Sequence, residues 1–132
     1  MSTMSSKISL IGAPVEAGTQ QNGCLMGPDA YRTAGLVSAL RQLGHVGEDR
    51  GNLALPAQLP EPPAHPNTAI RELAQVRAWT EVIHDATYAA AQNSLPIILG
   101  GDHSISAGTV PALARHADEA GQPLFVLWLD AH

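Results

Sequence analysis

Short apolar runs recur along the chain at wide intervals. Residues 7–13 (KISLIGA), 95–101 (LPIILGG) and 124–130 (LFVLWLD) are apolar over most of their length and show no strict alternation with polar residues. Such runs are typical of strands that are buried on both faces of a parallel sheet. Residues 45–53 (HVGEDRGNL) indicate a further short strand. The hydrophobic pattern therefore predicts four strands.

Helical patterns occupy most of the intervals between these runs. Pro28 suits the first turn of a helix, and we expect a helix over residues 28–43 that stops at Gly44. A longer helix is predicted from residue 67 or 68 to about 93, and another over about 105–120. In the longer helix, apolar residues recur every three or four positions, as expected for one buried face: Ile70, Leu73, Val76, Trp79, Ile83, Ala86 and Ala90.

Two segments lack a periodic pattern. Residues 15–28 are polar and rich in glycine, which predicts a loop, and residues 55–66 carry five prolines, which predicts an exposed, extended connection. Strands separated by helices predict an α/β fold with three layers, α/β/α, around a mostly parallel sheet. With 132 residues and no internal repeat, residues 1–132 are expected to belong to a single domain.

Charge and composition exclude several classes of partner. The net charge is −5 and the seven Lys and Arg residues are scattered, so we expect neither nucleic acid nor a membrane as a partner. No apolar run approaches the roughly 20 residues that span a bilayer, and no signal peptide is evident at the amino terminus. The single cysteine, Cys24, cannot form an internal disulfide, which fits a reducing compartment. These features predict a cytoplasmic protein.

Two predicted strand ends carry residues that could bind a metal. Asp102 and His103 follow the Gly-Gly pair that ends the third predicted strand, and Asp130 and His132 end the last one. In parallel sheets, ligands gather at the carboxyl ends of the strands. Asp130 and His132 would point to the same side, because side chains alternate along a strand. A mixture of imidazole and carboxylate donors suits Mn²⁺, Zn²⁺ or Fe²⁺, so these residues form a candidate metal site.

Structural roles remain open for the same residues. Asp102 could cap the following helix or orient His103, and we expect such a positioning role rather than direct metal binding. His103 alone, or Asp130 with His132 alone, would be a weak indication. Residues 15–28 contain neither GxGxxG nor GK[ST], so no phosphate loop is predicted. The remaining histidines are expected on the surface or in loops and the tryptophans in the core: His45, His65, His84, His116, Trp79 and Trp128.

The motifs GGDHS (100–104) and WLDAH (128–132) occur in this order in one known family. Together they resemble the ureohydrolases, the arginase and agmatinase family of binuclear manganese enzymes. The amino-terminal half adds ISLIGAP, GCLMGPDAYRTAGL and DRGNL, which are similar to the opening of arginases. The resemblance covers the whole chain except the proline-rich segment.

This resemblance implies roles for individual residues. His103 matches a histidine that binds one manganese ion, Asp130 a carboxylate that bridges two ions, and His132 a histidine on the second ion. In the family, the Asp-Ala-His run continues into another Asp, and the other ligands lie further along the chain. We therefore expect residues 1–132 to be the amino-terminal portion of a longer, arginase-like enzyme, and we expect this portion to be inactive alone.

The implied activity is manganese-dependent hydrolysis of a guanidino group, in which two Mn²⁺ ions activate water for attack on the guanidinium carbon. L-Arginine, giving L-ornithine and urea, is the preferred substrate because GPDAYRTAGL and DRGNL look arginase-like. Agmatine or another guanidino or formimidoyl compound is the alternative. A metal-poor binding or regulatory protein without activity is an alternative of a different class. The resemblance also implies a small-molecule substrate and a homo-oligomer.

Overall fold

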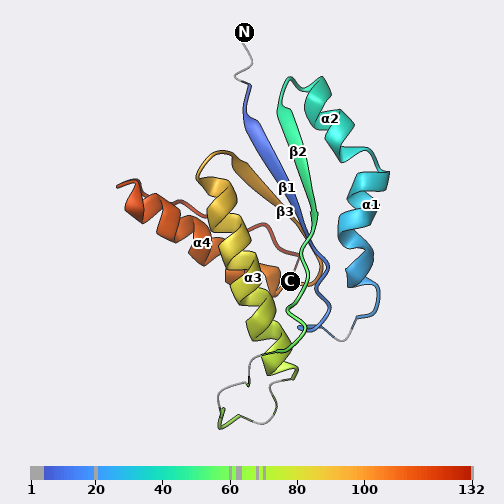
Figure 1. The fold of residues 1–132 in the computed structure, drawn as a ribbon, viewed down its shortest axis with the longest axis vertical. Coiled ribbons are helices and arrows are strands. Elements are labelled where there is room, and N and C mark those ends of the chain that lie inside the picture. The colour runs from blue at the N-terminus through green and yellow to red at the C-terminus, as the bar shows by residue number, and fades with distance from the viewer. Residues whose placement is uncertain are drawn as a thin grey trace.

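A sheet of three parallel strands forms the centre of the molecule (Figure 1). The strands are β1 (Lys7–Ala13), β2 (Val46–Asn52) and β3 (Leu95–Gly100), in the order β2-β1-β3. β1 therefore lies in the middle and pairs in parallel with both neighbours. The first three predicted strands are confirmed.

Helices separate the strands along the chain. The structure, a computed structural model, describes residues 5–19, 21–59, 61, 64–67, 69 and 71–131. No helix in these ranges is long and apolar enough to cross a membrane. The helices are η1, a single 3-10 turn (Cys24–Met26), α1 (Gly27–Thr33), α2 (Leu36–Gln42), α3 (Leu73–Ala91) and α4 (Ile105–Glu119).

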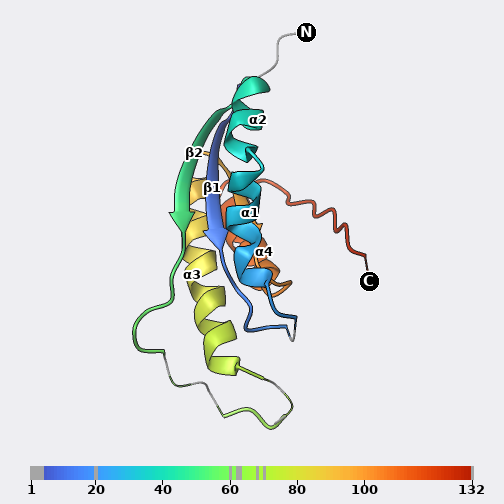
Figure 2. The same cartoon turned by 90° about the vertical axis from the view of Figure 1, so that its right-hand side faces the viewer.

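Both faces of the sheet are covered, with α1 and α2 on one side and α3 and α4 on the other (Figures 1 and 2). Side chains of β1 alternate between these faces, as they do along any strand. Ile8 and Leu10 belong to a buried cluster against which α2 packs. Ala13 belongs to a second cluster, with Trp79 and Ile83 of α3. The predicted three-layer α/β/α fold with a parallel sheet is confirmed.

The single helix predicted over residues 28–43 is in fact two helices. Gly35, between α1 and α2, has a φ of 87° and lies in the left-handed region. Its amide donates to the Arg32 carbonyl and closes the last turn of α1. Glycine enters this conformation without steric cost, so it ends one helix and redirects the chain. The apolar periodicity continues across the break and therefore did not indicate it.

The helix predicted from residue 67 or 68 begins later than expected. The side-chain oxygen of Asn67 accepts a backbone N–H two residues on and makes a local turn, and α3 starts only after Glu72, which has a φ of 46°. Thr68 and Ile70, which the prediction also used, lie outside the described residues. The described part of the proline-rich segment 55–66 has no helix or strand, as predicted.

The strand predicted at 124–130 is not formed, so this prediction is wrong for this structure. The segment is neither helix nor strand, and Phe125 and Leu129 are 88% and 87% exposed. Figure 2 shows it leaving the helical layer and extending away from the sheet. A strand needs a neighbour to pair with and a layer to cover its faces. Within the described chain this segment has no paired strand, and the apolar pattern alone does not reveal that.

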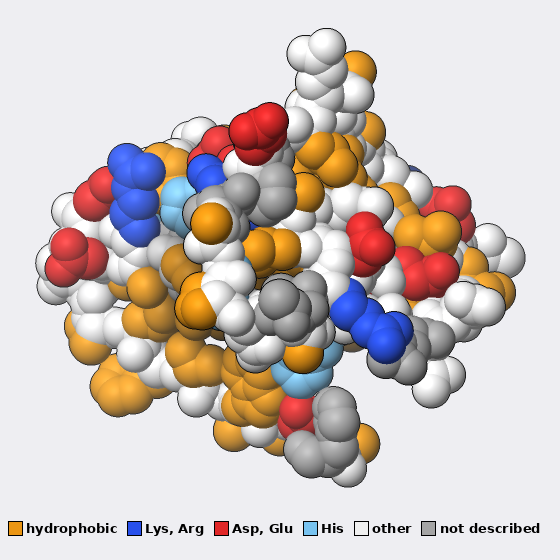
Figure 3. All heavy atoms as spheres, turned by 90° about the horizontal axis from the view of Figure 1, so that it is seen from below, with side chains coloured by type: hydrophobic (Ala, Val, Ile, Leu, Met, Phe, Trp, Pro, Cys, Tyr) orange, Lys and Arg blue, Asp and Glu red, His pale blue; other side chains and the backbone are white. Residues whose placement is uncertain are grey.

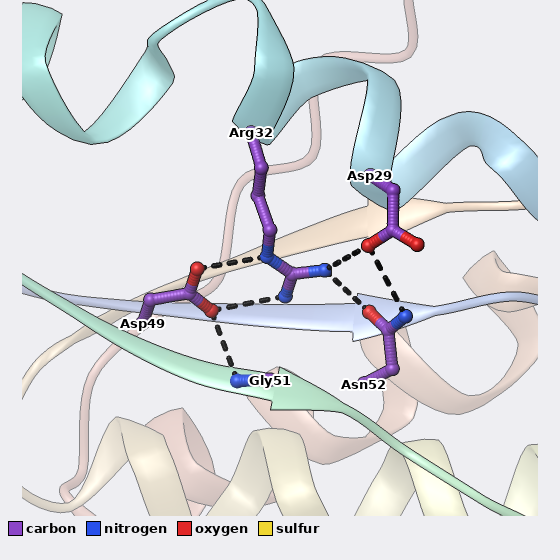
Figure 4. A network of polar contacts seen from close by, with 5 residues as sticks. All are labelled: Asp29, Arg32, Asp49, Gly51 and Asn52. Carbon is purple, nitrogen blue, oxygen red and sulfur yellow. Dashed lines mark hydrogen bonds and ion pairs between the residues drawn. The ribbon is translucent and has the colours of Figure 1, made fainter.

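A polar network joins α1 to the carboxyl end of β2 (Figure 4). Arg32 donates from Nε and Nη2 to the two carboxylate oxygens of Asp49, at 2.7 and 2.9 Å. Its Nη1 donates to Asp29 at 2.9 Å and to Asn52 at 2.5 Å. A Cβ on Gly12 would lie 1.9 Å from the Asn52 oxygen, so glycine leaves the space that Asn52 occupies. The Arg32 hydrogen bond holds the pKa of Asp49 below its ordinary value, as a two-pronged arginine–carboxylate pair should.

Arg32→Gln should lower the free energy of unfolding at pH 7 by about 0.5–2 kcal/mol, because it removes charged hydrogen bonds from a partly exposed site. The pKa of Asp49 is depressed in the folded state, so the pair stabilises the fold above the unfolded-state pKa, about 4. That stabilisation is lost as the pH falls through the lower folded-state pKa. Urea denaturation of both proteins should therefore give unfolding free energies that draw closer together as the pH falls below about 4.

The control is Arg41→Gln on α2, because no ion pair of Arg41 occurs among the residues that the structure describes. It should change stability by less than about 0.5 kcal/mol. An equal loss in the two variants, or a difference that does not shrink as the pH falls below about 4, would contradict the structural role of the network.

Gly108→Ala should destabilise the protein by about 1–3 kcal/mol, because α3 and α4 touch through this glycine. A Cβ there would lie 2.6 Å from the Thr80 carbonyl oxygen and 2.9 Å from the Ile83 Cβ. Intrinsic helix propensity predicts the opposite sign, since alanine is favoured over glycine by about 1 kcal/mol. The test is urea denaturation beside Ala114→Gly, an exposed control on the same helix. A more stable Gly108→Ala protein would show that the helices are free to separate.

Candidate functional site

The carboxyl ends of β1 and β3 lie side by side and define the candidate site. The Gly101 amide donates to the Ala13 carbonyl at 3.4 Å, and the Asp102 amide donates to the Val15 carbonyl at 2.9 Å. A Cβ on Gly101 would lie 2.6 Å from both the nitrogen and the oxygen of Val15. Only a residue without a side chain fits there. The glycine pair therefore lets the segment after β3 contact the segment after β1.

Asp102 is buried at this junction, with 5% of its surface exposed. One carboxylate oxygen accepts the Gly18 N–H at 2.7 Å, and the other accepts the Ser104 N–H at 2.9 Å and the Ser104 hydroxyl at 2.5 Å. These contacts join the loop between β1 and α1 to the start of α4. The positioning role expected for Asp102 stays a prediction. The sequence did not indicate Gly18 as a partner, because the two residues are 84 positions apart.

The side chains of His103 and Asp130 meet beside this junction. His103 Nδ1 lies 3.8 Å from Asp130 Oδ2, and the two side chains are 51% and 22% exposed. The Trp128 ring lies 5.3 Å from the His103 ring at 30°, and its Nε1–H donates to Asp130 Oδ2 at 3.2 Å. The expected core position of Trp128 is wrong, since this residue is half-exposed on the segment after α4. His132 lies outside the described residues.

One imidazole nitrogen and one carboxylate oxygen thus converge at the carboxyl edge of a parallel sheet. This donor pair suits a divalent metal such as Mn²⁺ or Zn²⁺. In the described ranges, no group of three or more His, Cys, Asp or Glu side chains is arranged around one metal position. The residues that the structure describes therefore do not by themselves surround a metal position.

A cavity of about 440 Å³ is lined in part by Gly18 and Ser104, the two residues that Asp102 bonds. Ala17, Gly18 and Thr19 of the β1–α1 loop form one side, and Arg71 and Ser104 contribute polar groups. The sequence does not indicate that these loop residues line a cavity, because a loop without a phosphate-binding pattern gives no sign of what it lines. Figure 3 looks at the end of the molecule to which the strands point, and the Lys and Arg side chains on this face are separated rather than gathered in one patch.

Comparison with known protein families and sequences gives a consistent result. The profile of the Arginase family matches residues 6–132. The chain is 53% identical over 123 residues to an arginase of Brucella suis, which covers 93% of this chain and 40% of the relative. It is 34% identical over 131 residues to an arginase of Staphylococcus aureus, covering 98% of this chain and 42% of the relative.

Solved structures give the same fold. The arginase of Bacillus caldovelox matches with a TM-score of 0.71 and 33% identity, over 84% of this chain and 37% of that one. The arginase of Bacillus cereus matches with a TM-score of 0.70 and 32% identity, over 83% and 35%. The chain thus spans about 40% of the length of the curated relatives it matches. Its sequence and its fold both show that this chain belongs to the Arginase family.

Proposed function

We propose that residues 1–132 are the amino-terminal portion of an arginase and lie within its single α/β domain. The longer enzyme then hydrolyses L-arginine to L-ornithine and urea. The convergence of His103 and Asp130 at the carboxyl edge of the sheet carries this proposal. The relatives that are identical to this chain at about half of the aligned positions are named arginases, which favours arginine over agmatine as the substrate. The substrate is then a small guanidino compound, and the enzyme acts in the cytoplasm as a homo-oligomer.

His103, Asp130 and His132 are the residues that would hold manganese, two ions in the complete site. The observed pair fits this role, since a neutral imidazole and a carboxylate are donors that Mn²⁺ accepts. When bound, the metal lowers the pKa of water and so supplies a nucleophile near neutral pH. Two donors cannot fix two cations, so the complete site needs further oxygen donors.

Residues around the pair orient the candidate ligands. Trp128 covers one side of the His103 ring and donates a hydrogen bond to Asp130, which limits the positions that both side chains can take. Such supporting contacts set the direction of a ligand's donor atom.

The experiments use a chimera in which residues 1–132 are joined to the part of the Brucella suis arginase that lies beyond the matched segment. His103→Ala in this chimera should reduce the bound manganese and lower kcat for urea release by a factor of about 100 or more, because a metal site loses a nitrogen donor. Elemental analysis and a urea assay measure the two effects.

His116→Ala, a change near the end of α4, is the matched control and should retain full manganese content and activity. Full metal content and activity in His103→Ala would show that His103 is only structural. A chimera that releases urea from agmatine but not from arginine would correct the substrate.

The 132-residue chain alone should release no urea from arginine, even with excess Mn²⁺. His103, Asp130 and His132 supply too few donors to hold two cations at a fixed separation. The measurement is a urea assay on the purified chain, with the chimera as the positive control. Turnover close to that of the chimera would overturn the assignment of further ligands to other parts of the enzyme.

A further inference from the structure

The buried carboxylate of Asp102 is held by uncharged donors. Among the described residues, no Lys, Arg or His side chain forms an ion pair with it. Burying a carboxylate is costly unless its oxygens accept hydrogen bonds. Gly18 and Ser104 supply three such bonds. An asparagine of the same shape would turn an NH₂ group toward one of these donors and lose at least one bond.

Gly18 approaches Asp102 so closely that its lack of a side chain matters. A Cβ at this position would lie 3.1 and 3.2 Å from the two Asp102 carboxylate oxygens and 3.0 Å from the Ser104 Cβ. These distances are tighter than ordinary contacts, so any side chain here would push the loop outward. Glycine at 18 and aspartate at 102 therefore act together to hold the β1–α1 loop against the start of α4.

The loop that Asp102 holds also lines the cavity described above. Ala17, Gly18 and Thr19 line that cavity, and Ser104, the other partner of Asp102, lines it as well. His103 lies between Asp102 and Ser104 in the sequence. The volume of about 440 Å³ is within the range of sites for small molecules. Both residues that Asp102 bonds, Gly18 and Ser104, thus lie in the wall of this cavity.

We propose that Asp102 is a positioning residue that fixes the β1–α1 loop as one wall of the substrate cavity, so that it governs the affinity for the guanidino substrate rather than the chemical step. This inference rests on the proposed function, since it takes the cavity as the place where the substrate of that reaction binds. It separates the role of Asp102 from that of its neighbour His103.

The test compares Asp102→Asn and Gly18→Ala in the chimera with Asp118→Asn, an exposed carboxylate on α4. Asp102→Asn and Gly18→Ala should each raise KM for arginine by about ten-fold or more. Their kcat should stay within about three-fold of that of the unsubstituted chimera, and their manganese content should be unchanged. Hydrogen exchange should become faster at the amides of residues 16–19, and β1 and α4 should keep their protection. Asp118→Asn should match the unsubstituted chimera in every measurement.

Faster exchange without a change in KM would show that Asp102 holds the loop but that the loop is not a wall of the substrate site. Unchanged exchange would show that Asp102 does not hold the loop. A fall in kcat together with loss of manganese would assign Asp102 to the metal ligands. Any of these results overturns the inference.

If the unsubstituted chimera does not hydrolyse arginine, the proposed function fails by itself. The inference is then judged by calorimetric Kd values for arginine, and equal values in the chimera and Asp102→Asn, or no binding, overturn it.

Discussion

The backbone contact between the ends of β1 and β3 is the constraint on which the candidate site depends. The Asp102 amide can donate to the Val15 carbonyl only because Gly101 has no side chain. A Cβ on Gly101 would lie 2.6 Å from Val15. That contact brings the segment after β3 over the segment after β1, and His103 follows directly. In a central strand with both faces buried, β1 has little freedom to shift. The position of His103 is therefore fixed by the sheet itself.

Two carboxylates close to the sheet illustrate two ways of placing a charge. Asp49 is paired with a cation, Arg32, and this partner holds its pKa below the ordinary value. Asp102 is buried and bonded only to backbone N–H groups and a hydroxyl in the part of the chain described here. An ion pair tolerates partial exposure and some motion, whereas a ring of neutral donors must be in place around a buried carboxylate. Asp49 thus fastens a helix to a strand, and Asp102 fixes the shape of a loop.

The sequence predicted the elements whose signals are local. β1, β3 and α4 follow from apolar runs, a Gly-Gly pair and helical periodicity, and the first three strands and the three-layer arrangement are confirmed. The break at Gly35 was missed because the periodicity of the apolar residues runs through it. The contact of Gly18 with Asp102 could not be predicted, since it joins residues 84 positions apart through backbone geometry alone. The strand expected at 124–130 depended on a neighbour that no pattern within the segment can reveal.

The meeting of His103 and Asp130 was expected from two adjacent strand ends, but it arises in a different way. Asp130 lies on a segment without a strand partner in the described chain, and the Trp128 ring and indole N–H are among the contacts that place it beside His103. Contacts of this kind contribute about 1 kcal/mol each, far less than a ladder of backbone hydrogen bonds between covered strands. One candidate ligand is thus held by the sheet and the other by a few side-chain contacts. A centre for two cations requires donors fixed to within a fraction of an ångström, so the segment that carries Asp130 must be fastened by additional structure before both residues can serve one metal site.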